Sequence, residues 1–385
     1  MTKVNSIIKK LIHLFFIFLT VTLYGQRKEI RIPMTAAGWK YNTETVEFVT
    51  HRSVAAVRPK AGEDLNIQLK NHQFTDGTIE YDVEFTGRGF PGIGFRSSND
   101  QKYAELFYIR YFGTVDPLSR YTTQYATVID GVNMWDMTDE YQAAATIYDE
   151  GWNHVKLVIH GKQMRVYVND MDNVALHVPS LEGTGKSGSI YLTGDVIYAN
   201  LVIKPDAVGD LPEVEGYDPT YSDTRYLKNW LVSAPVDLAF NRDIMKPGIA
   251  IDSTLLNDSS WKPLVTERRG MVNLTREYGA TENGKRRLVW LKTKIKSDVD
   301  QVRKLHLGFS DEIWVFLDGQ PLHIDKNYYA SPGMKEPRGR CTIENSEIMV
   351  PLKKGDNELL LGVAHYFFGW GVTARLDSTD NLKFE

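Results

Sequence analysis

The chain has 385 residues, of which 42% are hydrophobic and 24% charged, a composition typical of a globular protein long enough for two domains. The formal net charge of −4, with no basic domain or Lys/Arg stripe, argues against a nucleic-acid-binding protein. Aromatic residues make up 11% of the chain, and such rings either fill β-sandwich cores or form platforms for sugars.

The N-terminus has the layout of a secretory signal peptide. Three lysines precede an apolar run from Leu11 to Leu23, which is shorter than the ~20 residues that a transmembrane helix needs. We predict cleavage after Gly25, which removes residues 1–25 and leaves no transmembrane segment in the mature chain.

The cysteine content suits a bacterial protein. Cys341 is the single cysteine, so no intrachain disulfide can form. An exported protein without disulfides fits bacterial export better than a eukaryotic secretory route. We therefore expect a secreted or periplasmic protein, or one associated with the bacterial cell surface.

The first region, residues 26–204, is dense in strand signals. Residues 154–160 and 164–168 alternate around a Gly161-Lys162 turn, which predicts a hairpin, and further strands are predicted at 188–192 and 197–203. Because many short strands occur without a three-turn helix, the pattern indicates an all-β sandwich or jelly roll.

One strand of this region carries three carboxylates. From Thr78 to Phe85 polar and apolar residues alternate without a break, so Glu80, Asp82 and Glu84 share one face. Carboxylates spaced E-x-D-x-E can be the acid and base of a glycan hydrolase, and their separation along a strand is workable for that chemistry. They can equally be the solvated face of a half-buried strand.

A proline-bearing acidic stretch at residues 205–224 predicts a linker, and residues 225–385 form a second β-rich region. Residues 288–295, 313–317 and 357–364 are predicted strands of that region. The fold class is therefore all-β, with two domains.

The first region resembles the concanavalin A-like lectin/glucanase superfamily, in its laminin G-like branch. The resemblance rests on the order of loose motifs: Phe74 to Phe85, Gly92 to Arg96, Tyr103 to Arg110, Gln124-Tyr125, Asp130 to Trp135, Gly151 to Val155, Val166 to Asn169 and Ala199 to Leu201. Relatives include sugar-binding modules and the domain of 3-keto-disaccharide hydrolases, so the resemblance implies a sandwich and a carbohydrate partner.

The second region is similar to a galactose-binding-like jelly roll. The motifs that carry this are Trp290 to Thr293, Gly308 to Asp311, Trp314 to Gly319 and Gly355 to Leu359. The resemblance implies a sugar-binding domain of the kind attached to many glycosidases.

The superfamily resemblance bears on the carboxylate strand. Family-16 glucanases carry an E-x-D-x-E strand, which would correspond to Glu80, Asp82 and Glu84. In those hydrolases, however, the catalytic strand lies further along the domain. The resemblance thus favours a structural role for the three carboxylates and leaves them as weak catalytic candidates.

Polar and aromatic residues on the same strands are candidates for binding carbohydrate. Arginine and carboxylate groups can form paired hydrogen bonds with sugar hydroxyls, and Tyr or Trp can offer a flat ring. The candidates are Arg96, Glu105, Tyr108, Arg110, Gln124, Tyr125, Trp135 and Trp370. A buried Arg–Glu pair and core rings are the alternative for this set, and Tyr328-Tyr329 could line a rim.

No metal or cofactor is predicted with any specificity. The acidic loop that holds Asp130, Asp136, Asp139 and Glu140 could bind Ca²⁺, but it lacks EF-hand spacing and fits a solvated loop. The histidines have no zinc-ligand spacing.

These observations favour an exported carbohydrate-binding protein that acts on, or supports the breakdown of, extracellular glycans, with a polysaccharide or oligosaccharide as partner. Two alternatives stay open: a glycoside hydrolase, either glucanase-like or 3-keto-disaccharide hydrolase-like, and a structural or adhesion protein. The carbohydrate-binding hypothesis rests on the presence of two sugar-associated folds in one chain and not on the chemistry of a site. An enzyme is therefore the less favoured possibility.

Overall fold

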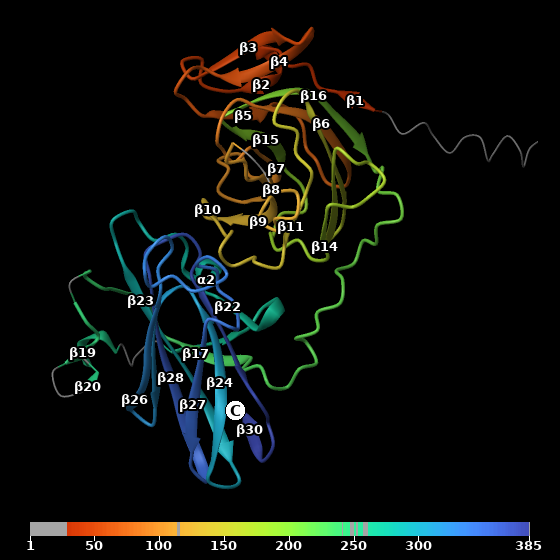
Figure 1. The fold of residues 1–385 in the computed structure, drawn as a ribbon. Helices are drawn as coiled ribbons and strands as arrows, with labels where there is room; N and C mark the ends of the chain where they lie inside the picture. The colour runs from red at the N-terminus through yellow and green to blue at the C-terminus, as the bar shows by residue number, and fades with distance from the viewer. Residues whose placement is uncertain are drawn as a thin grey trace, which may run out of the picture.

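A computed structural model describes residues 29–113, 116–240, 242–246, 250–251, 253–256 and 261–384 (Figure 1). The predicted signal peptide, residues 1–25, lies outside them. The described chain is all-β, with antiparallel sheets that form two sandwich domains, as predicted. Its α-helical content is the short α2, Leu274–Tyr278. No helix in these ranges is long and apolar enough to cross a membrane.

The first sandwich consists of two sheets. One has the order β14 (Leu176–Val178), β13 (Gln163–Val168), β12 (Asn153–His160), β6 (Gly77–Phe85), β16 (Val196–Pro205), β4 (Val54–Pro59) and β3 (Val46–His51), with β1 (Ile30–Arg31) on β16. The other has the order β10 (Val132–Asn133), β9 (Thr123–Ile129), β8 (Ala104–Ile109), β7 (Gly92–Ser97), β15 (Ser189–Gly194), β5 (Leu65–Leu69) and β2 (Trp39–Lys40), with β11 (Gln142–Ala143) on β9.

Alternation along the strands places the core between these sheets. The predicted strand at residues 78–85 is β6, and its apolar residues Ile79, Tyr81 and Val83 are buried in the core. The predicted hairpin is also confirmed, because β12 and β13 pair from Val155↔Val168 to His160↔Gln163. One face of each sheet is thus committed to the core, and only the outer faces can meet a ligand.

The segment after β16 is an ordered strap along the first sandwich. Its backbone accepts hydrogen bonds from Gln163 Nε2 to Val214 O (2.6 Å) and from Lys162 N to Glu213 O (2.8 Å). Figure 1 shows this segment running down the outside of the first sandwich to the second. The predicted linker therefore connects the two sandwiches by a fixed route.

The second sandwich also has two sheets. The larger has the order β21 (Lys262–Val265), β17 (Asn229–Val232), β23 (Arg287–Ser297), β28 (Gly355–His365), β25 (Asp311–Leu317) and β26 (Gln320–Asn327), with β18 (Val236–Asp237) and β30 (Leu382–Phe384) on β23. The smaller has the order β22 (Met271–Asn273), β29 (Gly371–Leu376), β24 (Gln301–Phe309) and β27 (Ser346–Leu352), and β19 (Met245–Lys246) pairs with β20 (Ala250–Ile251). The strands predicted at 288–295, 313–317 and 357–364 lie within β23, β25 and β28, respectively, and are confirmed.

The two sandwiches pack against each other through buried side chains. Met134 and Met137 of the first form one cluster with Met271 and Cys341 of the second. The guanidinium of Arg269, from the second sandwich, donates to Met137 O (2.6 Å) and to Glu182 (2.5 Å). In Figure 1 the end of the first sandwich around β9–β11 faces the end of the second that carries α2 and β22. Burial of both methionine and arginine side chains fixes this contact.

Candidate functional site

The carboxylates of β6 lie on the outer face of their sheet, where basic side chains from the neighbouring strands and from the β3–β4 turn pair with them. Glu80 accepts a bond from Lys204 Nζ (2.9 Å), and Asp82 lies 2.6 Å from His154 Nδ1. Glu84 accepts from Arg52 Nε (2.7 Å). The three carboxylates are thus used in cross-strand ion pairs.

The hydrogen bonds on this face favour the charged forms of Glu84 and His154. A hydrogen bond from Arg52 lowers the pKa of Glu84, and the hydrogen bond with Asp82 raises the pKa of His154. A general acid of a glycosidase needs a carboxyl whose pKa is raised. None of these residues lines the pockets described in this section. The geometry therefore gives the three carboxylates the structural role.

A pocket of about 360 Å³ lies between the two sandwiches, on the outer face of the other sheet. We call it the interdomain pocket. Its aromatic lining comprises Phe90, Tyr108, Phe112, Tyr121 and Trp135 from the first sandwich and Tyr329, Phe367 and Phe368 from the second. Arg110, Arg338 and Arg340 also line it, and among the described residues no Asp or Glu does.

Strand alternation places the floor of this pocket. On β8, Phe107 and Ile109 point into the sandwich core, whereas Leu106 and Tyr108 belong to a separate cluster on the outer face. Gly92 of β7 is paired with Tyr108, and a Cβ at that glycine would lie 3.1 Å from Leu106 Cδ1. A floor built on strands is held in place by the sheet and by the core beneath it.

Loops of the second sandwich form the opposite wall. Phe367 and Phe368 follow β28, and their loop is fixed because the Asp311 carboxylate accepts from Tyr366 N (2.7 Å) and Phe367 N (3.0 Å). The carboxylate of Asp136, from the first sandwich, accepts from Gly369 N (3.1 Å). One carboxyl group from each sandwich therefore holds this loop over the pocket.

The rings contact one another across the domain boundary. Trp135 packs edge-on against Tyr329 at 5.0 Å and against Phe368 at 5.7 Å between ring centroids. Tyr329 stacks on Phe367 at 5.8 Å. Phe90 and Phe112 are each 50% exposed, Tyr329 45% and Phe368 40%, so ring surface remains open to a ligand.

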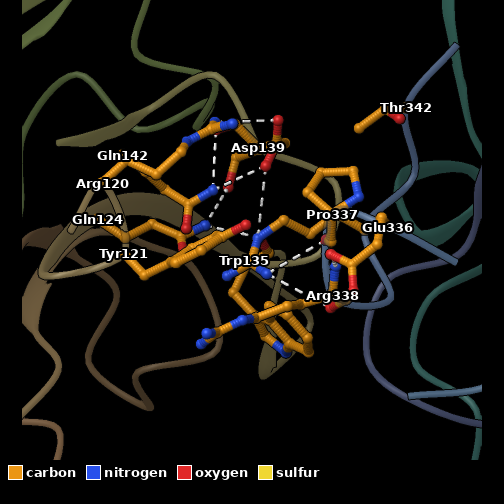
Figure 2. Close-up of polar contacts among 12 residues, drawn as sticks. Arg120, Tyr121, Gln124, Trp135, Asp139, Gln142, Glu336, Pro337, Arg338 and Thr342 are labelled. Atoms are coloured by element: carbon orange, nitrogen blue, oxygen red, sulfur yellow. Dashed lines mark hydrogen bonds and ion pairs between the residues drawn. The ribbon is translucent and has the colours of Figure 1, made fainter. Parts of the chain in front are cut away.

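Arginines surround Tyr121 at the rim of the pocket. The Arg338 guanidinium lies 4.4 Å and the Arg340 guanidinium 5.0 Å from the Tyr121 ring centroid, and Arg340 also lies 5.0 Å from that of Trp135. Figure 2 draws Arg338 with Tyr121 and Trp135. Burial, together with the nearby charge of Arg110, lowers the pKa of Arg340 to about 10.

A polar network behind the pocket supports these side chains. Gln124 Nε2 donates to Trp135 O (2.6 Å), and Arg110 donates to Tyr108 Oη (2.9 Å) and Tyr121 O (3.0 Å). Figure 2 shows Asp139 joined to Arg120 and Gln142. The network orients Trp135 and Tyr108 without placing a carboxylate in the lining.

The predicted binding residues separate into two groups. Tyr108, Arg110 and Trp135 line the interdomain pocket, and Gln124 lies directly behind it. The other four lie in structural positions: Arg96, Glu105, Tyr125 and Trp370.

Arg96 and Glu105 are buried structural groups. Arg96 donates to Asp76 (2.8 Å) and to Thr75 O (2.9 Å). Glu105 accepts from Tyr125 Oη (2.6 Å), and burial raises the pKa of its carboxyl. These contacts hold loops to the first sandwich. The alternative of buried structural groups fits both side chains, although Arg96 forms its ion pair with Asp76 and not with a glutamate.

Trp370 belongs to the core of the second sandwich. Its ring is 0% exposed and stacks on His365 at 5.4 Å. A ligand has no access to either face, so the expectation of a binding role for Trp370 is corrected here. Its flanking glycines reflect close packing: a Cβ at Gly369 would lie 2.3 Å from Met137 Cγ.

Most of the second wall could not be assigned from the sequence. Tyr329 was considered as a rim residue, but Arg338, Arg340, Phe367 and Phe368 were not identified. They lie on loops without periodicity, far from the first-sandwich residues in the sequence. The run of aromatic residues from Tyr366 to Phe368 beside a glycine is the local signal that could have indicated Phe367 and Phe368.

The acidic loop contacts the second sandwich. Asp130 accepts from Ala280 N (3.1 Å), Asp139 lies 3.6 Å from Arg340, and Glu140 lies 3.3 Å from Arg269. Across the described ranges no group of three His, Cys, Asp or Glu side chains could hold a metal ion.

A second cleft, beside the strap, is lined by charges that pair with one another. Arg269 pairs with Glu182 (2.5 Å), and Arg276 with Glu267 (2.5 Å). Exposed apolar rings are concentrated in the interdomain pocket instead. That pocket is therefore the candidate functional site.

Comparison with known proteins bears on the first sandwich. Residues 34–204 match the model of the 3-keto-alpha-glucoside-1,2-lyase-like domain, which is the 3-keto-disaccharide hydrolase-like resemblance predicted from the sequence. Among curated proteins, none matches the chain. The second sandwich is present, and its galactose-binding-like identity stays a prediction.

Several solved structures are similar to the first half of the chain. The carbohydrate-binding module CBM66 from Bacillus subtilis is 16% identical, covers 43% of this chain and 95% of its own, and has a TM-score of 0.33. The β-glucanase of Bacillus licheniformis is 9% identical, with coverages of 47% and 100% and a TM-score of 0.32. A galectin-like protein from Bacillus subtilis is 11% identical, with coverages of 46% and 94% and a TM-score of 0.36. Such scores do not identify a function.

Proposed function

We propose that the protein binds carbohydrate in the interdomain pocket and acts as an exported glycan-binding protein that supports the breakdown of extracellular polysaccharide. The observation that carries this is the convergence of eight aromatic side chains and three arginines from two sandwiches on one cavity of about 360 Å³. Ligand pockets of about 300–1,000 Å³ combine an apolar lining with a few polar groups in this way.

The chemistry of a sugar fits such a lining. The C–H face of a pyranose packs on an exposed ring, and its hydroxyls accept or donate hydrogen bonds at the edges. Tyr329 and Phe368 offer exposed rings, while Arg338 and Asn133 supply polar groups at the same cavity. The match of residues 34–204 to a domain named for glucoside chemistry supports the same ligand class.

A lyase or hydrolase acting on 3-keto-glucosides is the second candidate, and the same match favours it. In a 1,2-elimination a base takes the proton from C2, beside the C3 carbonyl, as the C1–O bond breaks and its electron pair leaves with the aglycone oxygen. The arginines could stabilise the enolate. Within the described ranges, however, no Asp, Glu or His lines the pocket, and burial raises the pKa of Tyr108 to about 12. Binding is therefore the better-supported function.

Export is part of the proposal. The basic start and the apolar run of residues 11–23 support a secreted, periplasmic or cell-surface location, where polysaccharides are available.

The test is a titration of the chain from Gln26 onward against an unbiased oligosaccharide panel, followed by calorimetry and by the fluorescence of Trp135. We expect saturable binding that Phe368→Ala weakens at least about fivefold, since a lost stacking ring is worth ~1 kcal/mol or more. Tyr221→Ala is the matched control, because Tyr221 is 84% exposed on the strap, away from the pocket.

Two outcomes would contradict the proposal. If no member of the panel binds, the interdomain pocket is not a carbohydrate site. If a member is turned over, the enzyme alternative replaces it, and Phe368→Ala should then lower kcat/KM.

A further inference from the structure

The charge of the interdomain pocket is unbalanced. Arg110, Arg338 and Arg340 line it, and no carboxylate from the part of the chain that the structure describes joins them there. A buried or half-buried cation without a counter-ion is unfavourable, and the remedy in most proteins is a paired anion. The arrangement of each arginine shows whether the protein itself supplies that anion.

Arg110 is satisfied by neutral groups alone. Its guanidinium donates to Tyr121 O (3.0 Å), Tyr108 Oη (2.9 Å), Gln142 Oε1 (3.3 Å) and Gln124 Oε1. Among the residues that the structure describes, no carboxylate forms an ion pair with it. Burial lowers the pKa of Arg110, which is the consequence of desolvating a cation that lacks a counter-ion.

Arg340 shares a distant counter-ion. Its Nε lies 3.6 Å from Asp139, and the same carboxylate lies 3.1 Å from Arg120. One negative charge therefore serves two guanidinium groups. Arg340 is 3% exposed, so water contributes little to balancing its charge.

Arg338 is the accessible member of the group. It is exposed, lies over the Tyr121 ring, and has no ion pair in the described chain. The carboxylate of Glu336, its near neighbour, accepts a hydrogen bond from the Arg338 backbone N (3.0 Å). The backbone of Arg338 is held at φ 47°, an uncommon conformation for a non-glycine residue that often occurs at ligand sites.

We propose that the interdomain pocket is selective for acidic sugars: a saccharide unit that carries a carboxylate or a sulfate ester, with its anion on Arg338 and its ring against Tyr329 and Phe368. This inference rests on the proposed function and names its ligand class. The planar guanidinium fork matches both oxyanions and can bind either with two parallel hydrogen bonds. Arg110 and Arg340 add the positive field that a neutral sugar would leave unused.

The experiment compares matched ligands on the chain from Gln26 onward. Oligogalacturonate is titrated beside its neutral counterpart, a galactose oligosaccharide of equal length, and a sulfated galactose oligosaccharide forms the third arm. We expect an acidic ligand to bind at least about tenfold more tightly than its neutral counterpart, because a charge-assisted hydrogen bond contributes roughly that much. The stronger acidic arm identifies the anion, and the preference should shrink as salt is raised.

The variant Arg338→Gln should remove most of the preference for the acidic ligand while neutral binding changes little, and Arg338→Lys should restore part of it. Arg31→Gln, at an exposed arginine of β1 with 78% of its side chain accessible, is the matched control and should change nothing. Because Arg338 is exposed, its substitution should leave the melting temperature unaltered.

Equal binding of acidic and neutral ligands, or an acid preference that survives Arg338→Gln, would overturn the inference and leave the proposed function standing. Absence of binding by every ligand of any charge would overturn both.

Discussion

The two outer faces of the first sandwich carry charge in opposite ways. On the β6 face Glu80 and Asp82 pair with Lys204 and His154 of the adjacent strands, and Glu84 pairs with Arg52 of the β3–β4 turn. On the β8 face the cations meet rings, amides and hydroxyls, and the second sandwich closes over them. A regular row of charges is thus a paired surface here, and unpaired charge beside exposed rings marks the site.

The difference arises from what covers each face. The β8 face receives the loop of Phe367 and Phe368 and the loop of Arg338 from the second sandwich. The first sandwich supplies ten of the fifteen lining residues and the second supplies five, so neither sandwich alone forms the pocket. Substitutions at the contact between the sandwiches and in the wall of the pocket should therefore have larger effects than a substitution on the β6 face.

Arg269→Met should have the largest effect, because Arg269 joins the sandwiches through Met137 O and Glu182. Removal of one partner from a buried ion pair costs about 3–5 kcal/mol in free energy of unfolding. Urea denaturation measures that loss, and ligand binding should weaken with it. Arg165→Met is the control, since its partner Asp210 is exposed. An unchanged unfolding midpoint would show that this contact does not hold the pocket together.

Asp311→Asn should change how stability depends on pH. Burial raises the pKa of Asp311 to about 7, so the folded state binds this proton more tightly than the unfolded chain does. Its contribution to stability is therefore present below the ordinary carboxyl pKa and is lost as pH rises toward 7, by on the order of 1.4 kcal/mol for each pKa unit.

The asparagine removes that titration while its carbonyl can still accept from Tyr366 N and Phe367 N, which both reach one oxygen of Asp311. Urea midpoints between pH 4 and pH 8 should fall less in the variant than in the wild type. The neighbouring carboxyl groups of Asp136 and Glu312 stay the same in both proteins. Identical slopes would mean that Asp311 does not titrate in this range.

Glu80→Gln should have the smallest effect. Its pair with Lys204 lies at the surface of the β6 face, where such pairs contribute about 0–1 kcal/mol. Thermal denaturation should show a small change and calorimetry unaltered binding of any glycan ligand. A loss of binding in this variant would return the β6 face to consideration as a ligand site.

Strand periodicity explains what the sequence could reveal. The alternation at residues 78–85 predicted β6, and the turn at Gly161-Lys162 predicted the β12–β13 hairpin. Tyr108 and Arg110 were found because they lie on or beside a recognisable strand of the floor. Local patterns carry this information because neighbours in sequence alternate between core and surface.

The remaining features of the pocket arise from tertiary contacts between segments that are distant in the sequence. Arg338 and Phe367 come from loops of the second sandwich, and no local pattern relates them to Tyr108. Trp370 was misassigned because flanking glycines signal close approach to a bulky group, and here that group is the packed interface around Met137. The counter-ion of Arg96, which is Asp76, and the neutral partners of Arg110 also become visible only in the folded protein.

The most direct test compares two variants in one calorimetric titration with the tightest ligand of the panel. One is Tyr329→Ala/Phe368→Ala in the interdomain pocket, and the other is Glu80→Gln/Asp82→Asn/Glu84→Gln on the β6 face. The pocket variant should lose binding and the β6 variant should bind as the wild type does. Binding that survives in the pocket variant and disappears in the β6 variant would contradict the account.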